Sequence, residues 1–394
     1  MKKTFNKPSM KFEKNSILVL IAAAIIFIAA FLYIHSEDIL NGAGSIFWVY
    51  GNDQVAFERA TVTEIISENK KVDEVADGAF TGEQQLNVIV KSGRYKGESM
   101  VVDNYFGPDY GNPVAKGDGV ILTIKTLEDG KHTATVYEYN RIPLLAGLLL
   151  IFFVLIVLIG GRTGLKSLAG LIFTFICLFM ILIPLLLKGA PTVLTTFLVC
   201  IYIALVSFTI LGGVHRKTIS AFLGTASGAL FAMIFGMAAQ NLAKINGLRL
   251  EDAEPLLQLK YKGGIPVGVK GLLTAGIIIS ALGAVMDVAM SISSALEEIH
   301  AANPSVTRKE LFRSGMNIGR DMVGTMTNTL ILAFLGSEFT LIIFLYSREL
   351  TFYHMFSTAL VTLETISGLA SSIGMILSIP LTVFISSSLI TQRR

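Results

Sequence analysis

The chain has 394 residues, of which 53% are hydrophobic, and its mean hydropathy of +0.65 is too high for a water-soluble globular protein. Several uncharged runs reach or exceed about 18 residues, the length of a membrane-spanning helix, so the composition predicts a polytopic helical membrane protein. The net charge of +3 is small and the basic residues fall in short clusters between apolar runs, which argues against a nucleic-acid partner.

The first predicted element is the uncharged run at residues 17–34, which follows a lysine-rich segment at residues 1–16. A cleaved signal peptide has a similar pattern, but no small-x-small cleavage site follows Ala30. We therefore interpret residues 1–16 as a cytoplasmic tail and residues 17–34 as the first membrane span.

The next region, residues 35–141, is charged and rich in glycine, and it predicts a small all-β domain. Alternating apolar and polar residues indicate five strands, at residues 56–66, 85–91, 97–104, 119–126 and 133–139. Five short strands of this kind are typical of a small barrel, either OB or SH3-like. Tyr105, Phe106 and Tyr110 are candidates for a binding patch, although packing in the core or in a loop is the favoured interpretation.

Residues 142–390 form the predicted seven-helix transmembrane domain, with a cytoplasmic loop at residues 296–320. Its apolar runs place the spans at residues 142–159, 167–187, 191–211, 218–240, 265–295, 321–345 and 355–378. Basic residues gather on one side of these spans, which the positive-inside rule assigns to the cytoplasm. They are Arg162, Lys166, Arg216, Lys217, Arg308, Lys309, Arg313, Arg320, Arg393 and Arg394. The sequence thus predicts a bundle of about eight transmembrane helices, with both termini cytoplasmic and the barrel extracytoplasmic.

Two signals describe the end of the membrane domain. Thr307 and Glu310 have the spacing of a capping box, so a short interfacial helix is expected before the span at residues 321–345. The last apolar segment, residues 355–390, is about 54 Å long as a helix, against a hydrocarbon core of about 30 Å. Because Pro380 favours a kink or an end, we expect this span to finish near Ser378, with residues 379–390 at the cytoplasmic interface.

Polar side chains form a stripe on each of the last three predicted spans. Asp287 is the one carboxylate in the apolar segment 265–296, and Ser291 lies on the same helical face one turn later. A carboxylate in hydrocarbon costs about 2.5 to 3.5 kcal/mol, so Asp287 is expected to face protein or water. The other stripes contain Asp321, Thr325 and Asn328 on the seventh span and Glu364 on the eighth.

We expect Asp287, Asn328 and Glu364 to face one another across an internal hydrophilic path. A carboxylate in such a path binds and releases a proton or a monovalent cation, which couples a membrane gradient to a change in helix packing. The alternative is that Asp287 and Asn328 hydrogen-bond across helices as structural polar groups.

Motifs for other activities do not occur in the sequence. It contains no GxxxxGK[ST] loop, no HExxH and no nucleophile elbow, so ATP drive, zinc proteolysis and serine hydrolysis lack support. Cys177 and Cys200 both lie inside apolar runs, which indicates neither a disulfide framework nor a metal site. We therefore expect no enzymatic activity, no catalytic residues, no cofactor and no metal.

Several short motifs carry a family resemblance. They are Gly160-Gly161-Arg162, Gly212-Gly213-Val214-His215-Arg216-Lys217, Gly283-Ala-Val-Met-Asp287, Gly319-Arg320-Asp321 and the segment from Ser372 to Pro380. In combination they make the chain resemble the YibE/F family of bacterial multi-span membrane proteins, from about residue 56 to residue 385. The resemblance implies an architecture and a location in the bacterial plasma membrane, and little about mechanism.

A more distant similarity in plan is to SecD/SecF proteins and the resistance-nodulation-division permeases. The shared order is one span, an external domain, several spans, an Asp-bearing helix, a cytoplasmic loop, a Thr-rich helix and a final helix with small residues. The resemblance implies that Asp287 serves proton coupling, as the Asp of the corresponding helix does in those proteins. The chain departs from that plan by two additional spans before the Asp-bearing helix and by a much smaller external domain.

Two functional hypotheses follow from the sequence. The first is an ion- or proton-coupled transporter, or a gradient-driven export or secretion accessory, with Asp287 as the coupling carboxylate. The second is a non-transporting scaffold whose external barrel recruits an envelope partner or a ligand. The expected partners are the lipid bilayer, protons or monovalent cations, and an envelope protein or a second copy of the chain.

Overall fold

A computed structural model describes residues 14–40, 55–108 except 75 and 77, 111–126, 132–245, 271–348 and 351–391, with the single residues 257, 261, 266 and 268. The predictions that rest on residues 1–13, on Tyr110 and on Arg393 and Arg394 lie outside these residues. The chain divides into two compact units, one from Asp38 to Leu155 and the other comprising Met1–Glu37 and Ile156–Arg394. Each unit is described by itself.

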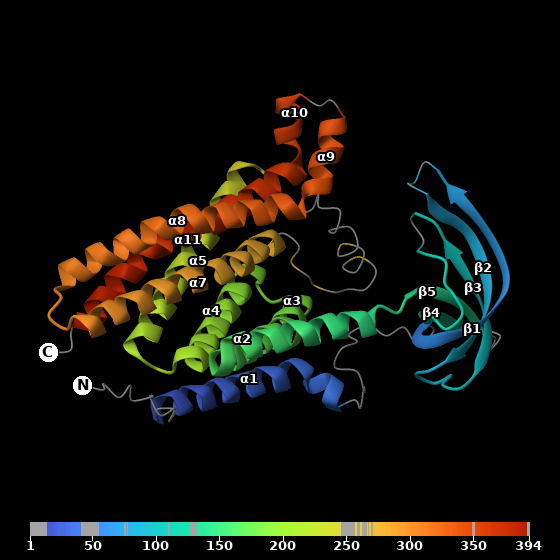
Figure 1. Ribbon diagram of the computed structural model, residues 1–394, viewed down its shortest axis with the longest axis horizontal. Helices are drawn as coiled ribbons and strands as arrows, with labels where there is room; N and C mark the ends of the chain where they lie inside the picture. Colours follow the sequence, from blue (N-terminus) through green and yellow to red (C-terminus); the bar gives the residue numbers. More distant parts are fainter. Residues whose placement is uncertain are drawn as a thin grey trace. The chain divides into compact units, whose positions relative to one another are not determined.

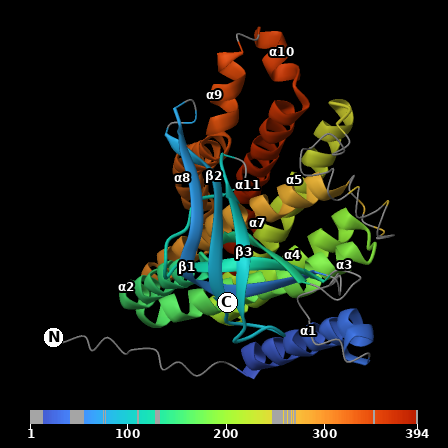
Figure 2. The same cartoon turned by 90° about the vertical axis from the view of Figure 1, so that its right-hand side faces the viewer.

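The first unit contains a closed barrel of five strands, which confirms the predicted barrel (Figures 1 and 2). The strands are β1 (Val55–Asp73), β2 (Ala79–Val90), β3 (Ser99–Phe106), β4 (Gly119–Thr126) and β5 (His132–Tyr139). They are ordered β1-β2-β3-β5-β4, and β5 pairs in parallel with β3, with Thr135 opposite Asp103. This closure is the Greek-key arrangement of an OB-type barrel.

The barrel core consists of inward-facing residues that alternate along the strands, such as Val62, Leu86, Val102 and Leu122. Phe106 is buried as expected, whereas the neighbouring Tyr105 is exposed, so the core-packing interpretation is wrong for Tyr105. β1 and β2 continue beyond the predicted strands as a paired ribbon that reaches Asp73 opposite Ala79. Most residues of this ribbon in β1 are exposed on both faces, so its sequence does not alternate between apolar and polar residues.

A buried amide at Gln84 ties the segment before β4 to the sheet. Its Nε2 donates to Glu68 Oε1 at 2.8 Å and to the Val114 carbonyl at 3.0 Å. Its Oε1 accepts from Asn104 Nδ2 and from the Val114 backbone N–H, each at 3.0 Å. Gln84 is only 2% exposed, and its partners Asn104 and Val114 are buried as well, so Gln84 satisfies groups that water does not reach.

Replacing Gln84 with Leu is expected to destabilise the barrel by about 2 to 4 kcal/mol, because several buried donors and acceptors lose their partner. Hydrogen exchange on the full-length protein checks this, and the amides near Val114 should exchange faster. Gln85→Leu is the matched control, because Gln85 is the adjacent residue and is exposed. Equal exchange in the two variants would contradict the role assigned to Gln84.

The second unit consists of helices, and the first unit also contains the start of α2. The helices are α1 (Lys14–Leu40), α2 (Ile142–Cys177), η1 (Leu178–Leu182), α3 (Ile183–Leu187), α4 (Thr192–Gly212), α5 (Arg216–Leu242), α7 (Leu272–Ala302), α8 (Arg308–Ser337), α9 (Phe339–Ser347), α10 (Phe352–Ser357) and α11 (Ala359–Thr391). Within the described residues, six helices are long and apolar enough to cross a membrane, or seven if the bent pair α8–α9 is one span. The chain is therefore a multi-pass membrane protein by length and composition.

The segment Ile142–Leu187 combines two of the predicted spans in one helical run of 46 residues. At about 1.5 Å per residue this run is about 69 Å long, more than twice the hydrocarbon core. Gly161 interrupts it with φ 53° and ψ −129°, a conformation that suits glycine. The interruption lies between the predicted spans 142–159 and 167–187, and the total of eight spans stays a prediction.

Two helices near the C-terminus differ from what the local signals suggest. The last helix, α11, does not break at Pro380 but continues to Thr391, and the end of the membrane span near Ser378 stays a prediction. Proline removes one backbone hydrogen bond, and burial of Ile379, Val383 and Ile390 against neighbouring helices keeps the helix intact. The expected short interfacial helix is instead the start of α8, which runs unbroken from Arg308.

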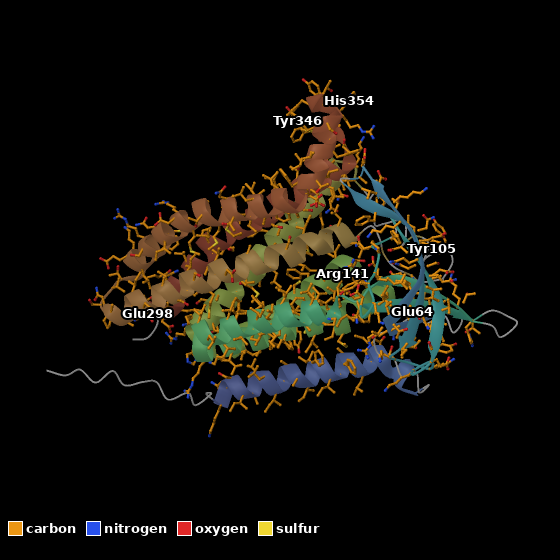
Figure 3. All side chains as sticks on the ribbon, turned by 45° about the vertical axis from the view of Figure 1, so that its right-hand side comes forward. Glu64, Tyr105, Arg141, Glu298, Tyr346 and His354 are labelled. Atoms are coloured by element: carbon orange, nitrogen blue, oxygen red, sulfur yellow. The ribbon has the colours of Figure 1, made fainter. Side chains whose placement is uncertain are left out.

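The capping box at the start of α8 is confirmed, because the Thr307 side chain accepts from the Glu310 backbone and the Glu310 carboxylate accepts from the Thr307 N–H. The predicted span at residues 321–345 is not one straight helix, since α8 and α9 meet at an angle of 62° at Glu338. In Figure 3 the labels Tyr346 and His354 mark the turn between α9 and α10 that follows this bend.

Helices α5, α7, α8 and α11 pack closely through glycines. A Cβ atom on Gly374 of α11 would lie 2.7 Å from both the Ala232 Cβ and the Gly228 carbonyl oxygen of α5. A Cβ atom on Gly319 of α8 would meet the Ile379 side chain of α11 at 2.3 Å. Figure 1 shows α8 and α11 running side by side along this contact. Small residues therefore set the spacing of these helices.

Candidate functional site

Asp287 lies at the midpoint of α7, with fifteen helix residues before it and fifteen after it. The opposite face of α7, with Val285, Val288 and Ile292, is fully buried against other helices. Asp287 and Ser291 are exposed on the outward face, and Glu298, labelled in Figure 3, lies on that face near the end of the helix. In the part of the chain that the structure describes, the Asp287 carboxylate has no hydrogen-bond or ion-pair partner.

The predicted polar stripe of α8 is also on an outward face. Asp321, Thr325 and Asn328 are exposed, whereas Leu311, Gly315 and Gly319 of the same helix are buried. The Thr325 hydroxyl donates to backbone carbonyls of its own helix, at Met322 (3.3 Å) and Asp321 (3.4 Å). No hydrogen bond joins Asn328 to Asp287, so the interpretation of this pair as an interhelical bond has no contact to support it.

Glu364 is partly buried on α11, one turn before Gly368. A Cβ atom on Gly368 would lie 3.3 Å from the Phe334 ring, which places this part of α11 against the end of α8. The structure thus places Glu364 near the bend between α8 and α9. It joins none of the six predicted residues to another by a side-chain hydrogen bond or ion pair, so no contact between described residues supports the predicted internal path.

A column of buried hydroxyl groups on α11 is the polar feature that the sequence reasoning missed. The Ser371 and Ser280 hydroxyls share a hydrogen bond of 2.7 Å, and Ser386 shares one of 3.0 Å with Ser293. The column occupies the contacts of α11 with α5 and α7, and its fully buried members are Ser371, Ser378, Thr382 and Ser386. Their spacings of seven, four and four residues could have indicated the column from the sequence, because positions at these spacings share one helical face.

Two hydroxyls near this column are buried without a partner. They are Ser372 Oγ on α11 and Thr225 Oγ1 on α5. A hydroxyl both donates and accepts, so a hydroxyl-lined helix contact exchanges its hydrogen bonds when the helices shift. This group of buried hydroxyls therefore lies between α5, α7 and α11, while the ionisable Asp287 lies on the outward side of α7.

A cavity of ≈ 550 Å³ lies where α4 begins, α5 ends and α7 begins. Its described lining includes Thr192, Gln240 and Thr274, and no charged side chain. The Thr274 hydroxyl donates to Gln240 Oε1 at 3.1 Å, while Gln240 Nε2 is buried without a partner. Within the described ranges, no group of three or more His, Cys, Asp or Glu side chains is arranged to hold a metal ion.

Comparison with known protein families gives two matches that together cover most of the chain. Residues 148–392 match the family model described as YibE/F-like protein. Residues 56–139 match the model described as the YibE/F family N-terminal domain, a range that contains nearly all of the five-stranded barrel. No curated protein and no solved structure gave a match.

Proposed function

This chain belongs to the YibE/F family, and from that premise we propose that it is an ion- or proton-coupled membrane transporter, or a gradient-driven accessory to export or secretion. We further propose a bacterial plasma-membrane location, eight spans with both termini cytoplasmic, and an extracytoplasmic barrel. The proposal assigns no enzymatic reaction to the chain and no nucleic-acid partner. The similarity in plan to SecD/SecF stays a prediction.

The observation that carries the proposal is the unpaired carboxylate at the centre of an apolar helix. Asp287 lies about 22 Å from either end of α7 by helical rise, which supports a position inside the bilayer. An ionised carboxylate there costs about 2.5 to 3.5 kcal/mol if lipid surrounds it. Asp287 therefore needs water, a cation, a proton or another protein surface, and binding and release of a proton or a cation there would be a step of transport.

The packing of α7 supports coupling between Asp287 and helix movement. The outward face of α7 carries Asp287, and its other faces contact α5 and α11 through small residues and through hydroxyl pairs such as Ser293 with Ser386. A change in charge at Asp287 alters whether its face of α7 prefers water or an apolar environment. The hydroxyl pairs permit α7 to shift against α11, because hydroxyl groups can exchange their hydrogen-bond partners. Ser291 shares the outward face of Asp287 on α7, and we propose that it acts with Asp287. Asp321, Thr325 and Asn328 of α8 and Glu364 of α11 are proposed to assist ion movement from their own helices.

Ion flux in reconstituted liposomes tests the proposal without a known substrate. The purified full-length chain is placed in liposomes that contain a pH-sensitive dye, and valinomycin with a potassium gradient imposes an inside-negative potential. We expect faster acidification than in protein-free liposomes, or faster entry of sodium when a sodium-sensitive dye is used. Flux of both ions at the protein-free rate would contradict the transporter proposal and leave the scaffold as the better interpretation.

A further inference from the structure

Outward-facing aromatic side chains gather on β1 and on β5, the strand that leads into α2. Tyr137 and Tyr139 alternate on the outer face of β5 and are 59% and 42% exposed. Phe57 of β1 is 46% exposed, and its ring meets the Tyr137 ring edge-on, with 5.2 Å between centroids. We call Phe57, Tyr137 and Tyr139 the aromatic band.

The joint between the barrel and α2 is short and hydrogen-bonded. Only Asn140 and Arg141 separate β5 from the first residue of α2. The Asn140 backbone N–H donates to the Gly119 carbonyl of β4 at 2.9 Å, and its side-chain oxygen accepts from the Ile142 N–H at 3.2 Å. The barrel and the first turns of α2, to Leu155, form one compact unit.

The joint limits how far the aromatic band can lie from the bilayer. Three residues from Tyr139 to Ile142 span at most about 10 to 11 Å, even when fully extended. The segment from Ile142 is a strongly apolar candidate span, so its start marks the membrane boundary. Tyr139 therefore lies within reach of the lipid headgroup layer, and Tyr137 is two residues further along the same strand.

The chemistry of the band fits that layer. Tyrosine combines an apolar ring with a polar hydroxyl, and such side chains concentrate where hydrocarbon meets water. At the joint, Arg141 forms an ion pair with Glu138 at 2.7 Å, and its label in Figure 3 marks the start of α2. A long basic side chain at a helix end reaches lipid phosphates while its stem stays in apolar surroundings. An aromatic ring exposed on a water-facing surface has no apolar partner, whereas a ring in the headgroup layer contacts lipid.

We propose that the aromatic band rests in the headgroup layer of the bilayer and holds the barrel against the membrane surface. The occupant of this face is lipid, not an envelope protein, because the band lies next to the chain's own entry into the membrane. The inference is independent of ion transport and of Asp287. It assigns Tyr137 and Tyr139 as lipid-contacting residues of the barrel.

Fluorescence quenching in lipid nanodiscs tests this proposal. The single tryptophan, Trp48, is first replaced with Phe, and a reporter is then introduced by Tyr137→Trp in the full-length chain. Phosphatidylcholine brominated near the headgroup end of one acyl chain serves as the membrane quencher, and acrylamide as the aqueous one. We expect at least about twofold stronger quenching by brominated lipid than for the control Phe80→Trp. Phe80 is an exposed aromatic residue on β2, a strand that borders neither β4 nor β5.

A second reporter, Tyr139→Trp, keeps the test informative if the first variant fails to fold. It is expected to be quenched by brominated lipid at least as strongly as the Tyr137 reporter, because it is closer to α2. Equal lipid quenching of the β5 reporters and the Phe80 reporter would overturn the proposal. Ready quenching of the β5 reporters by acrylamide would overturn it as well. The nanodisc contains only lipid and this protein, so such quenching would mean that the band faces water.

Discussion

Replacing Asp287 with Asn is expected to reduce ion flux by at least about tenfold, because asparagine keeps the shape of the side chain and cannot ionise. The same change should leave the protein as stable as the wild type or more so. A lipid-facing carboxylate costs about 2.5 to 3.5 kcal/mol that an uncharged amide largely avoids. The liposome assay with the pH-sensitive dye measures the flux, and thermal unfolding of the same preparation measures stability.

Glu298→Gln is the matched control for this prediction. Glu298 lies on the same outward face of α7, eleven residues later, so the change again removes one carboxylate from that face. Because Glu298 is near the end of the helix, where water reaches it, flux should stay close to wild type. Wild-type flux in Asp287→Asn would contradict the coupling role, and equal losses in both variants would point to surface charge instead.

Gly374→Leu is expected to destabilise the helical unit by about 3 kcal/mol, at the upper end of the usual cost of overpacking. The position is severe because a Cβ atom would contact a backbone oxygen of α5 at 2.7 Å, so neither flexible side chains nor rotamer changes relieve the clash. Separating α11 from α5 would also strain the buried hydroxyl column. Thermal unfolding detected by a thiol-reactive dye measures the loss, since Cys177 and Cys200 are buried until the helices open.

Gly276→Leu provides the control for the glycine prediction. Gly276 lies on an exposed face of α7, and a Cβ atom there would meet nothing within 4 Å. Leucine also has a higher helix propensity than glycine, so this variant should unfold at or above the wild-type temperature. If both variants unfold together, the close approach of α5 and α11 does not determine the stability of the bundle.

The candidate site shows where sequence reasoning reaches its limit. The spacing of Asp287 and Ser291 places them on one helical face, and the structure has them there. Which way that face points depends on α5, α8 and α11, whose packing is set by small residues far away in the sequence. The apolar face of α7 takes the packed side, so the polar face points outward instead of inward.

By itself, the sequence determined the membrane class, the five-stranded barrel and the capping box at Thr307 and Glu310. These features rest on composition, on alternation within a strand and on contacts three residues apart, all of which are local. Only the tertiary structure decided that α11 passes through Pro380, that β1 and β2 extend as a ribbon, and that serines of α7 and α11 pair. Those outcomes depend on burial against segments that are distant in the sequence. The local sequence pattern of a helix or strand does not identify which distant segment it contacts.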